Sequence, residues 1–329
     1  MANGDNLHKA RAAKNDEFYT RMEDIEHELV KYKEFFAGKR VYLPCDDANW
    51  SKFWYWLLMH FYDYGMVSIE ATCYHDGQHG EHWKYSGGED TQVFYSHIRE
   101  CKNNFGEFSK YCEYEVLEGD GDFRSPECTN ILMETDLVVT NPPFSLFREF
   151  VAWIGEKDFI IIGNKNALTY KEIFPMIKEN KVSLGYYEPS EFDQPKGDKL
   201  KSLKGLTKWF TSLDINKRHI KQEYYSRYDK SKYPHYDNYD AIEVSKSKDI
   251  PCDWTGIMGV PITWLDQYCV EQFEILDINP HFFSIIAQGL PKPKQLHISG
   301  QKDPYARILI RWKPEAMPSI DEKGIIRYS

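Results

Sequence analysis

The stretch DLVVTNPPFSLF, residues 136–147, leads from a leucine- and valine-rich segment into Asn141, two prolines and an aromatic residue. A short, continuous apolar run of this kind is typical of a strand buried in a parallel sheet. Pro142 disfavours the helical conformation at Asn141, and the two prolines fix φ and remove two N–H donors. The sequence therefore predicts a buried strand that ends in a rigid loop at Asn141. Ligands of open parallel sheets bind beyond such strand ends.

The Asn-Pro-Pro-Phe loop suits the binding of a planar amine. The side-chain oxygen of Asn141 and the carbonyl of Pro142 can accept both hydrogens of an exocyclic amino group, and Pro143 keeps the loop rigid. The ring of Phe144 can stack on the ring that carries the amine. An aromatic amine is a weak nucleophile, so positioning and polarisation supply most of the catalysis and no Ser, Cys or His nucleophile is needed. A proline-stiffened strand exit without a function is the simpler alternative.

The flanking sequence alternates between strand-like and helix-like segments. Strands are expected at 40–45, 66–74, 112–120, 136–140, 158–164, 181–188 and 207–214. Helices are expected at 22–36, 51–64 and 145–154. This alternation predicts an α/β fold with a mostly parallel sheet that is covered on both faces. Beyond residue 216 the composition becomes rich in Tyr, Asp and Pro, so we expect a core domain at 1–216 and a second domain at 217–329.

The composition is that of a globular protein. The chain has 329 residues, of which 42% are hydrophobic, and this is enough for one large domain or two moderate ones. No stretch resembles a signal peptide or approaches the roughly 18 apolar residues of a membrane span, so we expect no membrane association and a cytoplasmic location. The seven cysteines include no C-x-x-C pair and are expected to be free thiols.

The formal net charge of −10 argues against a polyanionic partner, but the charge is unevenly distributed. Between Lys196 and Lys232 there are eleven Lys or Arg against four acids, with aromatic residues interleaved. Such a segment is suited to phosphate contacts and base stacking. A solvated lysine-rich surface is an equally good interpretation.

Beyond the tetrapeptide, five segments of the chain resemble the EcoRI-type adenine-specific DNA methyltransferases. They are KNDEFYT (14–20), GDGDFRS (119–125), VVTNPPFSLF (138–147), YDNYDAIEVSKSKDIP (236–251) and GIMGVPITWL (256–265). The resemblance implies a Rossmann-like class I methyltransferase core at 1–216 and a C-terminal DNA-recognition lobe at 217–329. It also implies methyl transfer from S-adenosylmethionine to N6 of an adenine that is flipped out of double-stranded DNA. A cognate restriction endonuclease would be a separate chain, and the oligomeric state stays open.

The resemblance also implies roles for single residues. Asn141, Pro142, Pro143 and Phe144 match the catalytic amine clamp. The segment of Phe18, Tyr19 and Thr20 matches a motif that packs against the methionine end of the cofactor, although it could also be an ordinary lead-in to the first helix. Asp122 and Phe123 match an acidic-aromatic pair at the cofactor's adenine, with a turn-forming role for Asp120 or Asp122 as the alternative.

The loop after the first expected strand departs from the family pattern. Amino-methyltransferases commonly carry a glycine-rich loop there, whereas this chain has LPCDDANW (43–50) without glycine. Pro44, Cys45, Asp46 and Asp47 occupy the position, and a carboxylate there can pair with the cofactor's ammonium group. Glu70 in the second strand would bind the ribose hydroxyls or is simply a polar strand residue.

Competing chemistries find less support in the sequence. The stretch CYHDGQHGEH (73–82) matches no standard zinc spacing and is read as a polar loop, so no metal is expected. The clamp alone would also suit a cytosine-N4, RNA or protein-glutamine methyltransferase. A non-catalytic DNA-binding relative is a further alternative, because the missing glycines could weaken cofactor binding.

Overall fold

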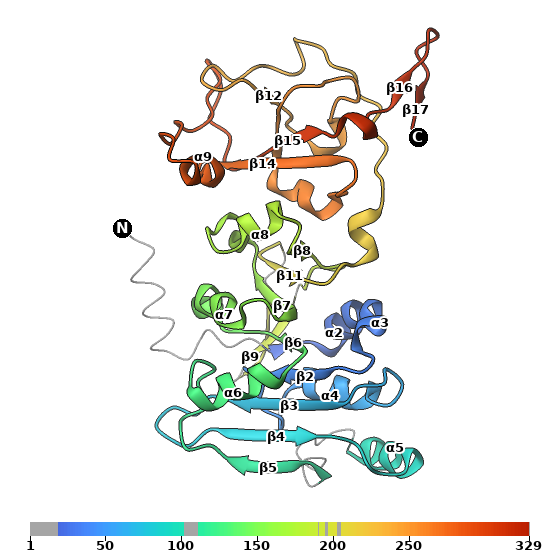
Figure 1. Ribbon diagram of the computed structural model, residues 1–329, viewed down its shortest axis with the longest axis vertical. Coiled ribbons are helices and arrows are strands. Elements are labelled where there is room, and N and C mark those ends of the chain that lie inside the picture. Colours follow the sequence, from blue (N-terminus) through green and yellow to red (C-terminus); the bar gives the residue numbers. More distant parts are fainter. Residues whose placement is uncertain (1–18, 102–110, 190, 195–196, 203–204, 329) are drawn as a thin grey trace. The chain divides into compact units, whose positions relative to one another are not determined.

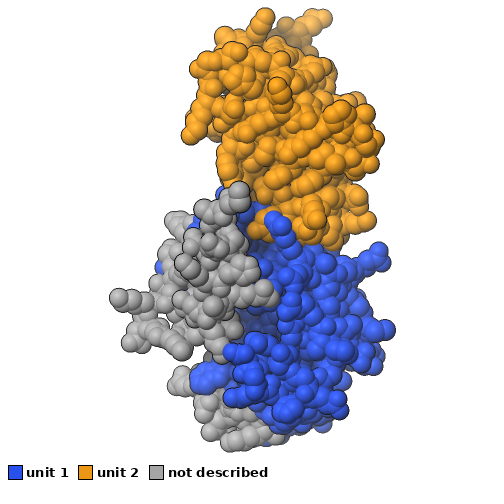
Figure 2. All heavy atoms as spheres, turned by 90° about the vertical axis from the view of Figure 1, so that its left-hand side faces the viewer, with its two compact units in different colours: residues 1–167, 184–213 blue, residues 168–183, 214–329 orange. Residues whose placement is uncertain are grey.

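The computed structural model describes residues 19–101, 111–189, 191–194, 197–202 and 205–328. The chain divides into two compact units. Unit 1 comprises residues up to 167 together with 184–213, and unit 2 comprises 168–183 and 214–329 (Figure 2). Among the described residues, no helix combines the length and the apolar character that crossing a bilayer requires.

An eight-stranded sheet forms the centre of unit 1, in the order β5-β4-β3-β2-β6-β7-β11-β8 (Figure 1). Its strands are β2 (Arg40–Leu43), β3 (Ser68–Cys73), β4 (Glu81–Tyr85), β5 (Glu113–Val116), β6 (Leu137–Thr140), β7 (Asp158–Asn164), β8 (Ser183–Leu184) and β11 (Thr207–Thr211). The four central strands β3, β2, β6 and β7 are parallel, whereas β4, β5 and β11 pair antiparallel with their neighbours. The expected α/β fold with a parallel centre is therefore confirmed.

The central strands are buried because their side chains are apolar on both faces. All four residues of β6 are buried, and Ile160, Ile161 and Ile162 of β7 are completely shielded from solvent. The helices of unit 1 are α2 (Met22–Leu29), α3 (Lys33–Phe36), α4 (Lys52–His60), α5 (Thr91–Glu100), α6 (Pro126–Glu134) and α7 (Phe147–Ile154), with the 3-10 turns η1 (Val30–Tyr32), η3 (Phe144–Leu146) and η4 (Lys165–Thr169), the last of which continues into unit 2. The side chain of Ser51 accepts a hydrogen bond from Trp54 N and caps α4, at the start of the helix that the sequence predicts at 51–64.

A second, three-stranded sheet brings the start of the described chain to the later part of unit 1. It has the order β1-β9-β10, with β1 at Tyr19–Thr20, β9 at Glu191–Gln194 and β10 at Gly197–Ser202. In this sheet Thr20 pairs antiparallel with Phe192. The pairing fixes the backbone of the KNDEFYT segment at its last two residues.

Unit 2 is built on a four-stranded sheet in the order β12-β13-β15-β14. Its elements are α8 (Phe174–Lys178), η5 (Asn216–His219), β12 (Ile242–Glu243), η6 (Ser247–Asp249), β13 (Met258–Pro261), η7 (Ile262–Gln267), β14 (Phe273–Asn279), α9 (Phe283–Ala287), β15 (Arg307–Trp312), η8 (Pro314–Ala316), β16 (Ser319–Ile320) and β17 (Ile326–Arg327). Within its core the side chain of Arg307 forms an ion pair with Glu243 (2.7 Å).

The division into units differs from the expected boundary at residue 216 in one respect. Residues 168–183, which the sequence placed in the first domain, belong to unit 2. The reason is α8, which packs on β14 and on the start of α9: the Phe174 and Phe283 ring centroids are 6.1 Å apart, and Lys178 Nζ donates to Ser284 Oγ (2.7 Å). These partners lie about a hundred residues further along the chain, so local sequence could not reveal them.

Candidate functional site

The Asn-Pro-Pro-Phe loop leaves the carboxyl end of β6 at the centre of the sheet. Thr140 is the last strand residue, Asn141 is half-buried and Pro142 is buried. The chain then turns into the 3-10 helix η3, with Phe144 half-buried at its first position. The prediction of a buried strand that ends just before Asn141 is confirmed.

The amide of Asn141 is oriented by Thr20 of β1. Asn141 Nδ2 donates to Thr20 Oγ1 (3.3 Å), and Thr20 itself is buried. Because the nitrogen faces Thr20, the amide oxygen is directed away from Thr20. The structure thus brings the end of the KNDEFYT segment to the Asn-Pro-Pro-Phe loop. Phe18 lies outside the described residues, and only the backbone of Tyr19 is described.

Asp46 links the glycine-free loop after β2 to the strand that carries the clamp. Its carboxylate accepts hydrogen bonds from Ser51 Oγ (2.7 Å) and from Thr140 Oγ1 (2.5 Å), and its backbone N–H donates to Thr72 O at the end of β3 (3.2 Å). Burial raises the pKa of Asp46 to about 6, although the two hydroxyl hydrogen bonds act in the opposite direction. Asp46 therefore joins the exit of β2 to the end of β6 through its side chain and to the end of β3 through its backbone N–H, and its side chain is buried.

Pro44 and Asp47 lie on either side of Asp46 in the same loop. Asp47 Oδ1 accepts from the backbone N–H of Asn49 (2.8 Å) and from its side chain (3.0 Å). The carbonyl of buried Pro44 accepts from Thr72 Oγ1 (3.5 Å), and Cys45 between them is half-buried. The loop is thus held against the end of β3 by hydrogen bonds, without the close backbone approach that glycines allow elsewhere.

The loop after β5 packs directly on the end of β3. His75 N donates to Asp120 O (2.8 Å), and Gly121 adopts a φ of +79°. A Cβ on Gly121 would lie 2.0 Å from the carbonyl oxygen of Cys73, so only glycine fits there. The exits of β2, β3, β5 and β6 therefore meet at one edge of the sheet.

Asp122 and Phe123 sit in this loop with partners of their own. Arg124 binds the Asp122 carboxylate through Nε (2.8 Å) and Nη2 (2.5 Å), and Asp122 N donates to Asp120 Oδ1 (3.1 Å). The Phe123 ring is buried, and its centroid lies 5.2 Å from that of Trp153 on α7. The turn-forming role of Asp120, which the sequence left open, is therefore present. The Asp122 carboxylate lies in the loop at the edge of the sheet where the strand exits meet.

Glu70 is placed apart from the other candidates. It lies in the middle of β3, where His82 Nε2 and Lys84 Nζ on β4 each approach its carboxylate to 3.1 Å. Burial alone would raise the pKa of Glu70, but the hydrogen bonds from His82 and Lys84 outweigh it and the pKa is lowered. The alternative of a polar strand residue describes this position well, and the strand's carboxyl end is three residues further on, at Cys73.

Several carboxylates lie near Cys73, at the edge of the sheet where the strand exits meet. The pKa of the Cys73 thiol is raised, first by burial and then by the charges of Asp47, Glu81 and Asp46. The same charges favour a positively charged ligand at this edge.

Part of the basic segment between 196 and 232 is structural. Lys208 is buried and paired with Glu188 (3.1 Å), and buried Arg218 donates to Asn180 O (2.6 Å). Of the aromatic residues interleaved with it, those shielded from solvent are Trp209, Phe210, Tyr224 and Tyr233. Tyr225, by contrast, is 64% exposed. These buried side chains fit neither interpretation of the segment, because they can neither contact phosphates nor form a solvated surface.

Sequence reasoning missed the residues that join the strand ends. Thr140, Thr72 and Gly121 are uncharged and the sequence assigned them no role, yet they hold the three loops together. The one available signal was Gly121 inside an acidic loop, where a glycine often marks a close backbone approach.

Comparisons with known proteins identify relatives over most of the chain. The chain is 39% identical to the Type II methyltransferase M.EcoRI of Escherichia coli, over 93% of this chain and 96% of that protein. It is 34% identical to the Type II methyltransferase M.MpnI of Mycoplasma pneumoniae (84% and 86% covered) and 31% identical to M.MgeORF184P of Mycoplasma genitalium (84% and 87% covered). No solved structure matches. The model of the family described as adenine-specific methyltransferase EcoRI matches residues 6–313, and the chain belongs to this family.

Proposed function

We propose that the protein transfers a methyl group from S-adenosylmethionine to N6 of an adenine flipped out of double-stranded DNA. The observation that carries the proposal is Asn141, which stands at the exit of a central parallel strand with its amide nitrogen committed to Thr20. Its oxygen, together with the Pro142 carbonyl, would accept the two hydrogens of the adenine amine. This arrangement would direct the nitrogen lone pair toward the methyl donor.

The residues at the strand ends fit the proposed cofactor. S-adenosylmethionine, when bound, supplies an electrophilic methyl group on a sulfonium and also carries an ammonium group. The carboxylates of Asp47 and Asp122 lie on the exits of β2 and β5, where they would receive the ammonium and the adenine amine. We assign Asp46 a bracing role rather than direct contact, because its side chain is buried and turned to the hydroxyl groups of Ser51 and Thr140.

Phe144 would cover the face of the flipped base, and the rigid prolines would hold the clamp during transfer. Thr20, Tyr19 and Phe18 would close the methionine side of the cofactor. We propose that unit 2 supplies DNA recognition, since the relatives are Type II methyltransferases by name and the four-stranded sheet of unit 2 is separate from the eight-stranded sheet of unit 1.

The proposal is tested with purified protein, labelled S-adenosylmethionine and unmethylated duplex DNA, followed by digestion to nucleosides. The expected product is N6-methyl-2′-deoxyadenosine. Asn141→Ala should lower kcat by about 10²–10³-fold while the protein still binds the cofactor. Label in N4-methylcytosine, in RNA or in protein would instead identify one of the other amine substrates and refute the adenine assignment.

A further inference from the structure

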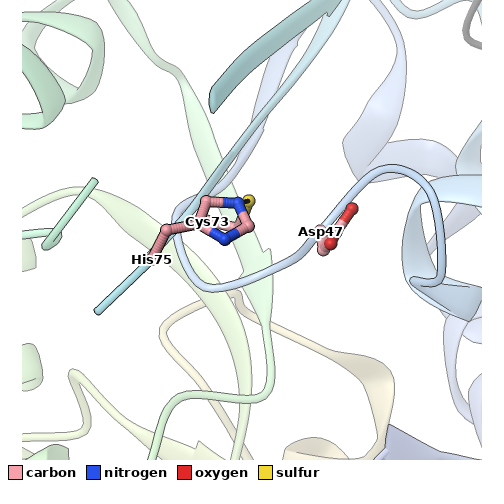
Figure 3. A group of neighbouring side chains, drawn as sticks. All are labelled: Asp47, Cys73 and His75. Carbon is pink, nitrogen blue, oxygen red and sulfur yellow. Dashed lines mark hydrogen bonds between the residues drawn. The ribbon is translucent and has the colours of Figure 1, made fainter. Parts of the chain in front are cut away.

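We propose that Asp47, Cys73 and His75 form a binding site for a divalent cation of the zinc type. Their ligand atoms all lie within 4.8 Å of one another (Figure 3). Cys73 and His75 come from the end of β3, and Asp47 comes from the loop after β2. The three residue types are those that bind zinc in proteins, and two of them fall in the stretch 73–82 that sequence spacing did not identify as a metal site.

The distances are close to those of a bound ion. Cys73 Sγ and His75 Nε2 lie 3.0 Å apart. In a tetrahedral zinc site a sulfur and a nitrogen ligand are roughly 3.5 Å apart, given the usual metal–ligand bond lengths. Small side-chain rotations would therefore be enough to admit the ion. The thiol would release its proton to solvent as the sulfur binds.

The backbone around the three ligands is already fixed. Cys73 closes β3 and packs against Gly121, and His75 N is bonded to Asp120 O (2.8 Å). The Asp47 carboxylate is steered by its two hydrogen bonds from Asn49. A site that is held before the ion arrives loses little conformational entropy on binding.

Three protein ligands leave the fourth position of a tetrahedral ion open, as in sites where zinc also binds a small molecule or water.

The ion and the cofactor would compete for Asp47. This consequence rests on the proposed function, which assigns Asp47 to the cofactor's ammonium group. Zinc would then raise the apparent Kd for S-adenosylmethionine, and the effect would be absent in His75→Ala. If the proposed function is wrong, the metal site is still tested by the zinc-binding experiment below, because that experiment does not involve the cofactor.

The test is a zinc titration of the cofactor-free protein against a chelating indicator. We expect one site per chain, weakened by more than about tenfold in Cys73→Ser and in His75→Ala. His79→Ala is the matched control, because His79 belongs to the same turn but its ring is bonded to the Leu117 carbonyl (2.9 Å). No zinc binding by the unaltered protein, or equal binding by His75→Ala, would overturn the proposal.

Cobalt gives a readout that does not depend on the variants folding. Co²⁺ added to the unaltered protein should produce a near-ultraviolet thiolate-to-cobalt charge-transfer band, and zinc should displace it. Zinc binding without this band would mean that Cys73 is not a ligand and would refute the site as described.

Discussion

The amide of Asn141 owes its orientation to a residue 121 positions away, Thr20. A single hydrogen bond of this kind contributes about 1 kcal/mol, which corresponds to roughly a fivefold change in rate when it is spent on positioning. Sequence predicted both residues, but it assigned Thr20 to the cofactor alone. The contact could not be foreseen, because it depends on the pairing of β1 with β9.

Removing the Thr20 hydroxyl should therefore impair transfer more than binding. Thr20→Val is expected to lower kcat by roughly fivefold with little change in the Kd of the cofactor, because the Asn141 amide would lose its orienting partner. Thr20→Ser keeps the hydroxyl and serves as the control. Equal kcat values for Thr20→Val and Thr20→Ser, measured by initial rates at saturating substrates, would argue against the orienting role.

Asp46 makes stability depend on pH. Its folded pKa of about 6 is higher than that of an ordinary aspartate, so the folded state holds a proton that the unfolded state has lost. The free energy of unfolding that depends on Asp46 is therefore fully present below pH about 4 and decreases as the pH rises to about 6. Hydroxyl donors from Ser51 and Thr140 offset part of this loss.

The comparison of the unaltered protein with Asp46→Asn isolates this effect, since other carboxylates titrate in both. We expect the stability of Asp46→Asn relative to the unaltered chain to increase as the pH rises from about 4 to about 6, by at most about 3 kcal/mol, and then to level off. Urea denaturation at a series of pH values measures it. Parallel stability profiles for the two proteins would contradict the raised pKa.

The elements of the site follow from sequence more fully than its contacts do. The apolar runs of β6 and β7 predicted their burial, and Ser51 predicted the start of α4. The antiparallel strand β4 was not predicted, because its residues Glu81–Tyr85 lie at the end of a polar, glycine-bearing stretch. The face of β4 that carries His82 and Lys84 forms ion pairs with Glu70, and such pairs are visible only once the strands are aligned.

Packing of the loop after β5 on the end of β3 should be sensitive to Gly121. Gly121→Ala is expected to destabilise the protein by more than about 2 kcal/mol, because the new Cβ would collide with the Cys73 carbonyl at a left-handed φ. Thermal and urea unfolding measure the loss.

Gly77→Ala is the matched control for this substitution. Gly77 also has a positive φ, of +70°, but no atom lies within 4 Å of the position of its Cβ, so only the backbone strain of about 1–2 kcal/mol applies. If the two variants lost the same stability, the close approach of Gly121 to β3 would not be important.

For the whole molecule, sequence predicted two parts and a parallel core, but it did not predict which residues make up each part. Segment 168–183 carries an apolar pattern that indicates burial without naming a partner, and that partner is β14 and the start of α9 in unit 2. Counting charges along the sequence likewise could not distinguish buried side chains from exposed ones. That count placed Lys208 and Arg218 in a segment suited either to phosphate contacts or to a solvated surface, whereas both are buried and satisfied by protein groups.

The exposed loop 288–295 of unit 2 is a better place to test DNA binding. It carries Lys292 between two prolines and Lys294 directly after the second, and it contains no acid. If unit 2 binds DNA through this loop, the double variant Lys292→Ala/Lys294→Ala should weaken binding and reduce the slope of log K against log salt by about 2. Fluorescence anisotropy at several salt concentrations measures the slope.

Lys323→Ala is the control for the lysine pair. Lys323 is also exposed in unit 2, but it follows Asp321 and Glu322, which neutralise the local field. Its removal should leave the slope nearly unchanged. An unchanged slope in the double variant would exclude loop 288–295 from the DNA-binding surface.

The most direct test of the central claim is nucleoside mass spectrometry of genomic DNA from an expression host that lacks adenine methylation. The unaltered chain should produce N6-methyladenine in that DNA, and Asn141→Ala, expressed at the same level, should produce none above background. N6-methyladenine at equal levels with both chains would contradict the clamp. Its absence with both, while the unaltered chain is folded and binds S-adenosylmethionine, would contradict the assignment of adenine in DNA as the substrate.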